Sequence, residues 1–286
     1  MKILWVTCDK QGGSRLTDDE LIKYGHDELG HEIIVDNKVT PGFDLVVLSN
    51  LHGLEEPVSK NIYSPYITIA HDYGFCSYYD AMCELHNCIE CEWKKKFQQL
   101  KKAALLNFFM SPAQYKIHVR MLDEIPNVRF IQSQLDWENL RRLRYTTKKK
   151  GTIIAPMVGG YHKGVDNLIT WSKRNKRIVT VIGATDSQTE KLKNEKYIDY
   201  KGYVNYETAL KMIAQSESVL FLPEWTEPTG RAVMEGILLG CKIITNDHLG
   251  LYSWITDTRP EDLIMQIQVS KISFWNQISF LLNGWR

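Results

Sequence analysis

Short apolar runs alternate with helical stretches along this chain, in two successive series. Each run has about the length of a β-strand, and helical stretches such as residues 17–29, which Gly30 ends, separate the runs. Strands that alternate with helices predict mainly parallel sheets covered by helices on both faces. The runs span residues 3–7, 33–35, 44–48, 66–70, 107–110 and 128–131 in the first series, and 152–155, 178–182, 218–222 and 242–245 in the second.

A polar, basic stretch at residues 141–150 separates the two series and is the best candidate for a linker, although a solvated loop would have the same composition. The sequence therefore predicts an α/β protein with two Rossmann-like domains in series, at 1–145 and 151–265. The tail has the pattern of one or two amphipathic helices, and residues 266–286 could pack back on the N-terminal domain. Ligands of open parallel sheets bind beyond the carboxyl ends of the strands, so we expect a binding cleft there.

The composition argues against several classes of protein. The 286 residues are enough for two ordinary domains, and the net charge of +1 gives no general attraction to nucleic acid or anionic membranes. No apolar run reaches the eighteen or so residues that span a bilayer, and Asp9 and Lys10 interrupt the first run too soon for a signal peptide. We therefore expect a cytoplasmic protein whose six cysteines do not form structural disulfides.

Glu227 and Glu235 lie eight residues apart, directly after a predicted strand. Pro228 and Gly230 predict a turn between the first glutamate and a helix that begins near Arg231. The free N–H groups and positive dipole end of that helix favour an anion beside Glu227. The segment therefore suits a phosphorylated ligand that also carries hydroxyl groups.

Other motifs accompany this pair of glutamates. A strand that resembles a known family's pattern follows at 240–246. In the second series there are also a lysine–glycine pair at 163–164 and a glycine–x–valine element at 202–204. In the first series there are an early glycine loop at 12–13, the entry of the second strand at 30–33 and a histidine–aspartate pair at 71–72. With these motifs the chain resembles the retaining glycosyltransferases of family four, or group 1. The resemblance implies the GT-B fold, in which two Rossmann-like domains with parallel sheets face each other across a cleft.

Three residues would carry the catalysis that this resemblance implies. Lys163 would contact the donor diphosphate, where a cation offsets the charge that builds up on the leaving phosphate. Glu227 would face the transferred sugar, and His71 would lie across the cleft near the reactive face of that sugar. The family's usual mechanism is same-face attack with the leaving phosphate helping to deprotonate the acceptor, so we expect no protein nucleophile and no catalytic metal.

Residues of the second domain would bind the nucleotide-sugar donor. Glu235 would accept hydrogen bonds from the ribose hydroxyls. The backbone around Thr229, Gly230 and Arg231 would cradle the sugar hydroxyls and the phosphates. The resemblance thus implies a UDP- or GDP-sugar as the donor substrate and a glycan, lipid-linked or other hydroxyl compound as the acceptor.

Two further pairs of residues complete the expected binding site. Tyr203 and Val204 would lie beside the base of the nucleotide. Gly12 and Gly13 would let the backbone of the first domain approach the phosphates or the acceptor, because glycine has no side chain to prevent it.

One position departs from the family's pattern. The family usually has an arginine directly after the glycine that precedes the lysine–glycine pair, and here that position is Gly160. Either Lys163 works alone, or Arg231 or Arg15 supplies the missing charge. The departure and the short chain leave open a non-catalytic protein that binds a nucleotide sugar or glycan. A nucleotide-sugar epimerase of the GT-B type is a second enzyme hypothesis. A nicotinamide dehydrogenase is excluded because the early glycines are not spaced G-x-G-x-x-G.

Four cysteines, Cys76, Cys83, Cys88 and Cys91, lie close together. In a reducing compartment this spacing suggests a metal more than disulfides, and four thiolates complete a tetrahedral zinc site. An iron–sulfur cluster, a disulfide and unlinked thiols are the alternatives, and His86 is a spare ligand. Some family members have a similar cluster after the histidine–aspartate pair. We expect a structural zinc that braces a loop.

Residues 93–102 predict a helix on which Trp93, Phe97 and Leu100 share one face among five lysines. Such a helix can lie on a membrane surface, and with a lipid-linked acceptor it would hold the enzyme near anionic lipid as a peripheral contact. The simpler interpretation is a solvated helix whose apolar face packs in the core. The partners expected otherwise are the nucleotide sugar and the acceptor, with no nucleic acid.

Overall fold

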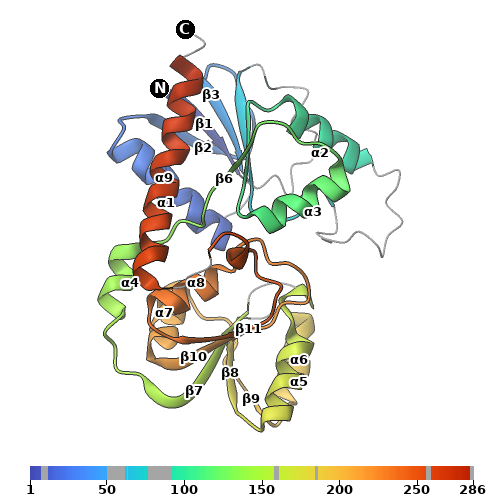
Figure 1. Ribbon diagram of the computed structural model, residues 1–286, viewed down its shortest axis with the longest axis vertical. Coiled ribbons are helices and arrows are strands. Elements are labelled where there is room, and N and C mark those ends of the chain that lie inside the picture. The colour runs from blue at the N-terminus through green and yellow to red at the C-terminus, as the bar shows by residue number, and fades with distance from the viewer. Residues whose placement is uncertain are drawn as a thin grey trace. The chain divides into compact units, whose positions relative to one another are not determined.

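The computed structural model describes residues 1–7, 12–49, 62, 64–76, 92–157, 161–183, 186–255 and 259–283 (Figure 1). The chain forms two compact units. The first consists of Met1–Leu135 together with Gln266–Arg286, and the second of Asp136–Met265. Each unit contains one parallel β-sheet accompanied by helices, which confirms the expected α/β architecture with two Rossmann-like sheets.

All six apolar runs of the first series form strands of the first sheet. The strands have the order β2-β1-β3-β4-β5-β6, and each neighbouring pair is parallel. Every residue of β3 and β5 is buried, as expected for parallel strands that are covered on both faces. The strands are β1 (Lys2–Val6), β2 (Glu32–Asp36), β3 (Leu45–Ser49), β4 (Tyr66–Ala70), β5 (Leu106–Phe109) and β6 (Val128–Phe130).

The first helix, α1 (Gly13–Asp27), begins four residues before the predicted start. Gly12 is its N-cap with a φ of 104°, a conformation that only glycine adopts readily, so the early glycines open the helix itself. The helix ends at Asp27, two residues before the predicted end. Gly30 follows with a φ of 65°, and its N–H donates to the carbonyl of His26 at 3.2 Å. The first unit also contains α2 (Glu92–Ala103), α3 (Pro112–Leu122) and most of α9 (Pro260–Asn283).

The C-terminal tail forms one continuous helix, α9, rather than two. Phe274 and Trp275 lie in the core of the first unit, where the Trp275 ring is 6.4 Å from that of Trp5. The indole N–H of Trp275 donates to the carbonyl of Leu21 in α1 at 3.1 Å. A Cβ atom at Gly25 would lie 2.4 Å from the Trp275 ring, so this glycine allows α1 and α9 to approach closely (Figure 1).

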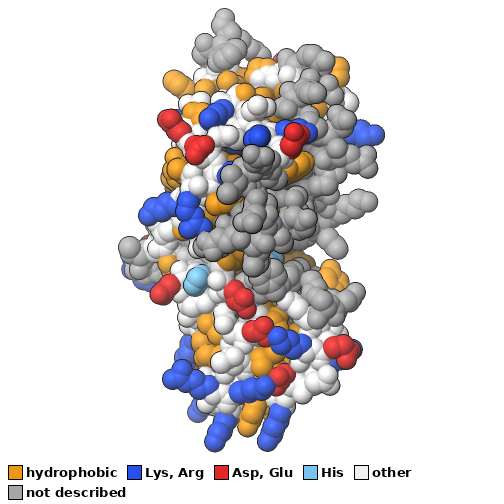
Figure 2. Space-filling view, turned by 90° about the vertical axis from the view of Figure 1, so that its right-hand side faces the viewer, with side chains coloured by type: hydrophobic (Ala, Val, Ile, Leu, Met, Phe, Trp, Pro, Cys, Tyr) orange, Lys and Arg blue, Asp and Glu red, His pale blue; other side chains and the backbone are white. Residues whose placement is uncertain are grey.

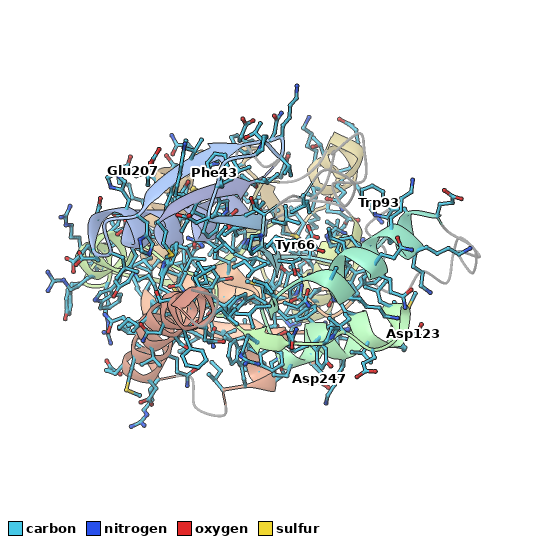
Figure 3. All side chains as sticks on the ribbon, turned by 90° about the horizontal axis from the view of Figure 1, so that it is seen from above. Phe43, Tyr66, Trp93, Asp123, Glu207 and Asp247 are labelled. Atoms are coloured by element: carbon cyan, nitrogen blue, oxygen red, sulfur yellow. The ribbon has the colours of Figure 1, made fainter. Side chains whose placement is uncertain are left out.

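The basic helix expected at 93–102 is α2, and its apolar face packs in the core. Phe97 and Leu100 are buried. Trp93 lies near the start of α2 (Figure 3), and its indole N–H donates to the carbonyl of Gly74 at 2.9 Å. The prediction that all five lysines surround this face is wrong in one case. Lys101 is 1% exposed, because it lies over the rings of Phe97 and Phe109 inside the unit.

The second unit contains a five-stranded parallel sheet with the order β11-β10-β7-β8-β9. Four of its strands are the predicted runs, but β9 was not predicted because its three residues include Asp199 and form no apolar run. The strands are β7 (Lys149–Pro156), β8 (Val179–Ile182), β9 (Ile198–Tyr200), β10 (Ser216–Phe221) and β11 (Lys242–Thr245).

Helices connect these strands throughout the second unit. Residues 141–150, which we interpreted as a linker, include the last residues of helix α4 and the first residues of β7. The helices are α4 (Trp137–Leu143), α5 (Val165–Asn175), α6 (Asp186–Lys193), α7 (Tyr206–Gln215) and α8 (Arg231–Leu238), with the short 3₁₀ helices η3 (Tyr161–Lys163) and η4 (Gly250–Ser253).

The centre of the second sheet is where the chain changes direction. β7 and β10 are neighbours, but β7 leads to β8 on one side of the pair and β10 leads to β11 on the other. The connections after β7 and β10 therefore diverge, and in a parallel sheet such a switch point leaves a crevice at the carboxyl ends of the strands. The segments that carry Lys163 and Glu227 follow the carboxyl ends of β7 and β10.

The surface carries charges of both signs, in keeping with the net charge of +1. Figure 2 shows Lys and Arg side chains interspersed with Asp and Glu on the face that it draws. Among the helices of the described ranges, none combines the length and apolar character needed to cross a bilayer.

Candidate active site

An ion pair joins the loops that follow β7 and β10. The ammonium of Lys163 donates to both carboxylate oxygens of Glu227, at 2.6 and 2.8 Å. The two side chains are 20% and 13% exposed, so the pair is partly shielded from water and stronger than a surface pair. Two of the three residues expected to be catalytic are thus brought together.

Gly164 explains how these loops come so close. It has a φ of 80°, and a Cβ atom at this position would lie 1.8 Å from the carbonyl oxygen of Leu222. Only glycine combines this backbone conformation with the absence of a side chain. The glycine of the predicted lysine–glycine pair therefore places Lys163 at the end of β10.

The backbone around Glu227 is held on both sides. Its N–H donates to the carbonyl of His248 at 2.8 Å, and its carbonyl accepts from the N–H of Gly250 at 2.8 Å. Glu227 thereby forms a parallel bridge with Leu249. These contacts fix the start of the loop, so the carboxylate is presented from a rigid backbone.

Helix α8 begins at Arg231, four residues after Glu227. Gly230 is its N-cap with a φ of 85°, and a Cβ atom there would lie 2.6 Å from the side chain of Leu249. The first N–H groups of a helix have no partner within it and favour anions. The buried hydroxyl of Thr229 also has no hydrogen-bond partner among the described residues. The predicted turn and helix start are both present.

Glu235 lies one turn further along α8 and is 5% exposed. Its Oε1 accepts hydrogen bonds from the hydroxyl of Tyr206 at 2.7 Å and from Nε of Arg231 at 2.9 Å. Burial raises the pKa of the Glu235 carboxyl, and Arg231 and Tyr206 oppose this shift. The sequence did not indicate Tyr206, since only the packing of α7 against α8 brings it here.

The two arginines considered as replacements for the one missing at Gly160 both have carboxylate partners. Arg231 pairs with Glu235, and Arg15 pairs with Asp19 at 2.8 Å. Gly160 itself lies outside the described residues. Among the described ion pairs of these cations, that of Lys163 is with Glu227.

An aromatic stack that the sequence analysis missed stands next to this ion pair. The rings of His162 and Trp225 are stacked with centroids 4.3 Å apart and an angle of 30° between planes. The N–H of Glu224 donates to the carbonyl of His162 at 2.9 Å, which ties the two loops together. Both rings are close in the sequence to Lys163 and Glu227, and this closeness could have suggested the stack.

Tyr203 and Val204 follow β9, at the carboxyl edge of the same sheet. The side chain of Tyr203 is 69% exposed, and Val204 is partly buried. The carbonyl of Gly202 accepts from the N–H of Gly183 at 2.8 Å, which ties this segment to the end of β8. Their contact with a base remains a prediction.

His71 follows β4 in the first unit, and little of its side chain is exposed. Its side chain is 5% exposed, and its Nε2 lies 2.9 Å from the Asp18 carboxylate and 3.0 Å from the Ser49 hydroxyl. Ser49 in turn donates to Asp18. Asp18 and Ser49 were not predicted, because nothing in the sequence links α1, β3 and β4 at this point.

Gly12 and Gly13, expected to approach phosphates or the acceptor, cap and open α1. The carbonyl of Gly12 accepts from the N–H of Leu16, and that of Gly13 accepts from the Thr17 hydroxyl, both at 3.0 Å. A Cβ atom at Gly12 would meet nothing within 4 Å, so its φ of 104° rather than crowding requires glycine. Their binding role stays a prediction.

Of the four clustered cysteines, Cys83, Cys88 and Cys91 lie outside the described residues. Cys76 is buried and takes part in no disulfide there. No group of three or more potential metal ligands occurs in the described ranges. The zinc site therefore stays a prediction from the sequence.

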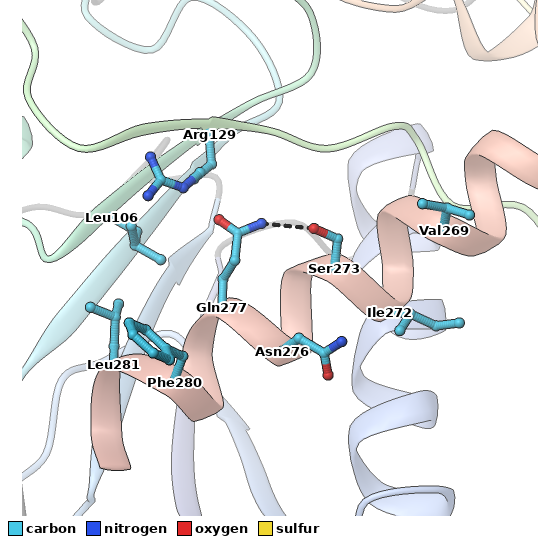
Figure 4. A pocket seen from close by; sticks show the side chains of 9 residues that line it. All are labelled: Leu106, Arg129, Val269, Ile272, Ser273, Asn276, Gln277, Phe280 and Leu281. Atoms are coloured by element: carbon cyan, nitrogen blue, oxygen red, sulfur yellow. Dashed lines mark hydrogen bonds between the residues drawn. The ribbon is translucent and has the colours of Figure 1, made fainter. Parts of the chain in front are cut away.

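The first unit has an apolar pocket of about 570 Å³ between α9 and the edge of its sheet (Figure 4). Leu106, Phe280 and Leu281 supply apolar walls, and Arg129 and Gln277 lie at its polar side. None of the predicted site residues lines it, and it is separate from the Lys163–Glu227 pair.

The family follows from a direct comparison. Residues 140–282, half of the chain, match the model of the family described as "Glycosyl transferases group 1". The protein belongs to this family of glycosyltransferases. No curated protein sequence matches the chain.

Solved structures share the fold, and they identify it as GT-B. HepE (Alr3699) of Anabaena in complex with UDP has a TM-score of 0.70 at 12% identity, with 99% of this chain and 100% of that chain covered. The sucrose-phosphate synthase of Thermosynechococcus elongatus has a TM-score of 0.69 at 11% identity, with 95% and 90% covered. AviGT4, a glycosyltransferase involved in Avilamycin A biosynthesis, has a TM-score of 0.65 at 15% identity, with 99% and 98% covered.

Proposed function

We propose that this protein is a retaining glycosyltransferase that moves a sugar from a nucleotide-diphosphate donor to a hydroxyl group of a glycan, lipid-linked or other acceptor. The observation that carries the proposal is the ion pair of Lys163 and Glu227 beside the start of α8. The pair places a cation next to a hydrogen-bond acceptor. A sugar diphosphate has the complementary groups, anionic oxygens next to hydroxyl donors.

Donor binding would exchange partners within this pair. Lys163 would turn from Glu227 to the diphosphate, where its charge and the N–H groups at the start of α8 stabilise the leaving group. Glu227, held by its backbone bridge to Leu249, would then accept hydrogen bonds from the transferred sugar. Glu235 would accept hydrogen bonds from the ribose, and the Thr229 hydroxyl adds a polar group at the helix start.

The chemical step would need no protein nucleophile. The acceptor oxygen forms a bond to the anomeric carbon on the face that the leaving phosphate occupies, while the bond from that carbon to the phosphate oxygen breaks. The acceptor proton passes to the leaving phosphate. We propose that His71, Gly12 and Gly13 of the first unit serve the acceptor and the sugar, with His71 held by Asp18 and Ser49.

The donor would be a UDP- or GDP-sugar. A solved structure of HepE contains UDP-glucose, and this supports uridine as the first base to test. Tyr203 and Val204, at the carboxyl edge of the second sheet, would lie beside the base. An exposed tyrosine ring offers a face for stacking.

The experiment measures release of nucleoside diphosphate from UDP- and GDP-sugars with mixed acceptors. We expect Lys163→Met to lower kcat/KM by about 100-fold or more, because it removes charge stabilisation from the leaving group. Glu227→Gln should also lower kcat, because a neutral amide is a weaker acceptor for sugar hydroxyls. Lys173→Met is the matched control, since Lys173 forms an exposed pair with Glu195, and it should leave turnover unchanged.

Three results would each contradict a part of the proposal. Unchanged turnover in Lys163→Met or Glu227→Gln would remove the residue from the mechanism. Binding of a nucleotide sugar without release of nucleoside diphosphate under any of these conditions would favour the non-catalytic binding protein. Inversion of one stereocentre of the donor's sugar, without transfer of that sugar, would favour the epimerase.

A further inference from the structure

Three side chains from two helices form a closed group in the second unit. Tyr206 is the first residue of α7, and Arg231 and Glu235 lie one turn apart on α8. An N-cap residue fixes where each of the two helices begins. Asn205 caps α7 and accepts from the N–H of Thr208 at 2.9 Å, and Gly230 caps α8. The group is therefore built on helix ends whose positions are set by capping.

Within the described residues, the side-chain hydrogen bonds of Glu235 all end on one of its two carboxylate oxygens. Oε1 accepts from the Tyr206 hydroxyl and from Nε of Arg231, and Nη2 of Arg231 also donates to the Tyr206 oxygen at 3.3 Å. Oε2 makes no hydrogen bond within the described chain. Oε2 is not fully buried, and the side chain keeps 6% of its surface exposed. Oε2 is the free acceptor of this carboxylate.

A buried carboxylate keeps its charge only if its partners offset the loss of water. Within the described residues, the charged and titratable groups that act on Glu235 are Arg231 and Tyr206. Burial raises the carboxyl pKa, and both partners lower it. Burial and Glu235 also raise the pKa of the Tyr206 hydroxyl, so this hydroxyl remains a donor at neutral pH.

We propose that Tyr206 and Arg231 are positioning residues for Glu235, which hold Oε1 so that an ionised Oε2 accepts hydrogen bonds from neighbouring hydroxyls of a nucleoside diphosphate's ribose. The proposal rests on the proposed function, because it specifies the donor-binding part of the same site. Because Oε1 is already held, the carboxylate cannot rotate away from the ligand, so the contact of Oε2 with a ribose hydroxyl is strong and directional.

The test compares binding of ribose and deoxyribose nucleotides by calorimetry, with UDP, GDP and their 2′-deoxy forms as probes. Wild-type protein should bind the ribose form about tenfold tighter or better, because the deoxy form leaves a charged acceptor unpaired. Tyr206→Phe, which removes a single oxygen atom, should reduce this ratio by about threefold or more. Tyr200→Phe is the matched control, because its hydroxyl has a side-chain partner too, Thr189, but makes no hydrogen bond to Glu235.

A pH series separates positioning from a general loss of structure. In Arg231→Met the Glu235 pKa rises further, so binding of the ribose form should weaken as the pH falls, from a higher pH than in the wild type. Arg231→Lys keeps a positive charge and should restore much of the wild-type pH profile. In a transfer assay, Tyr206→Phe should raise the donor KM more than it lowers kcat.

Each outcome is decisive. If Tyr206→Phe keeps the wild-type ratio between ribose and deoxyribose, or Arg231→Met keeps the wild-type pH profile, the positioning role is wrong while the proposed function stands. Equal binding of ribose and deoxyribose forms by the wild type overturns the ribose contact. If the wild type binds none of the probes and transfers no sugar, the proposed function itself fails.

Discussion

Lys101 is the residue whose surroundings differ most from what its charge would suggest. Its ammonium lies 5.0 Å from the centre of the Phe109 ring and donates to the Thr68 hydroxyl at 2.7 Å. Burial lowers its pKa from 10.5 to about 7, although Asp72 opposes the shift. The pKa of the nearby buried His118 is lowered to about 3, first by burial and then by Lys101. The first unit therefore holds two basic groups that prefer to be neutral.

This lysine predicts a pH dependence of stability. Between about pH 7 and 10.5 the unfolded chain binds a proton at Lys101 that the folded chain does not. The free energy of unfolding should therefore rise with pH in this window, by up to about 1.4 kcal/mol per pH unit. Urea unfolding at several pH values measures the slope. Lys101→Met should flatten it, whereas Lys102→Met, at an exposed neighbour, should not. An unchanged slope in Lys101→Met would refute the argument.

Gly164 is the second residue with a measurable consequence. Gly164→Ala combines a φ of 80° with a Cβ atom 1.8 Å from the Leu222 oxygen, so β10 and the Lys163 loop must separate. We expect a loss of about 3 kcal/mol or more in the free energy of unfolding, together with weaker nucleotide binding. Gly151→Ala is the control, because its φ is 79° but the nearest atom is 3.9 Å away. It should cost about 1–2 kcal/mol and leave binding intact.

At the scale of elements, α9 contributes the aromatic centre of the first unit. The rings of Phe274 and Phe108 are 4.8 Å apart, and Trp275 is 1% exposed. The last residues of the described chain thus complete a core that the first strand, β1, begins. The loss of this part of α9 would expose β1 and α1 together.

Substitutions on the two faces of α9 test this role. Trp275→Ala should lower the free energy of unfolding by about 3–5 kcal/mol, because it leaves a cavity and removes the hydrogen bond to Leu21. Phe280→Ala, on the same helix but 81% exposed, should change it by less than about 0.5 kcal/mol. Chemical unfolding monitored by circular dichroism compares them. Equal effects of the two substitutions would show that α9 does not stabilise the unit in this way.

At the scale of the whole molecule, each of the two units brings together its own set of polar residues. The second unit gathers Lys163, Glu227 and Glu235 around the start of α8, whereas the first holds Asp18, Ser49 and His71 together. The residues proposed to bind the donor therefore belong mainly to one unit. A donor nucleotide should stabilise that unit when it binds.

A thermal-shift series with full-length protein tests this expectation. At about 100 times its dissociation constant, a bound nucleoside diphosphate adds about 2.7 kcal/mol to the free energy of unfolding. We expect UDP or GDP to raise the melting temperature more than ADP does, and Lys163→Met to reduce the shift. Lys173→Met should behave as the wild type. Equal shifts with all three diphosphates would contradict a specific base site.

The sequence alone determined the features that depend on local chemistry. Ten strands could be predicted because apolar runs of strand length recur between helices, and the loops at Lys163–Gly164 and Glu227–Gly230 because their backbone requires glycine. The family match itself covers residues 140–282, while in the preceding part the short motifs predicted the same fold, and the likeness to solved structures covers nearly the whole chain.

Tertiary structure decided what depends on contacts between distant residues. Lys163 and Glu227 are 64 residues apart, and Trp275 and Leu21 are 254 apart. The burial of Lys101, the placement of Tyr206 against Glu235 and the strand β9 follow from packing against neighbours that no local pattern specifies. The sequence predicted the residues that we propose to bind a sugar nucleotide, and the fold decided which partners hold them, because hydrogen bonds and burial depend on distance in space.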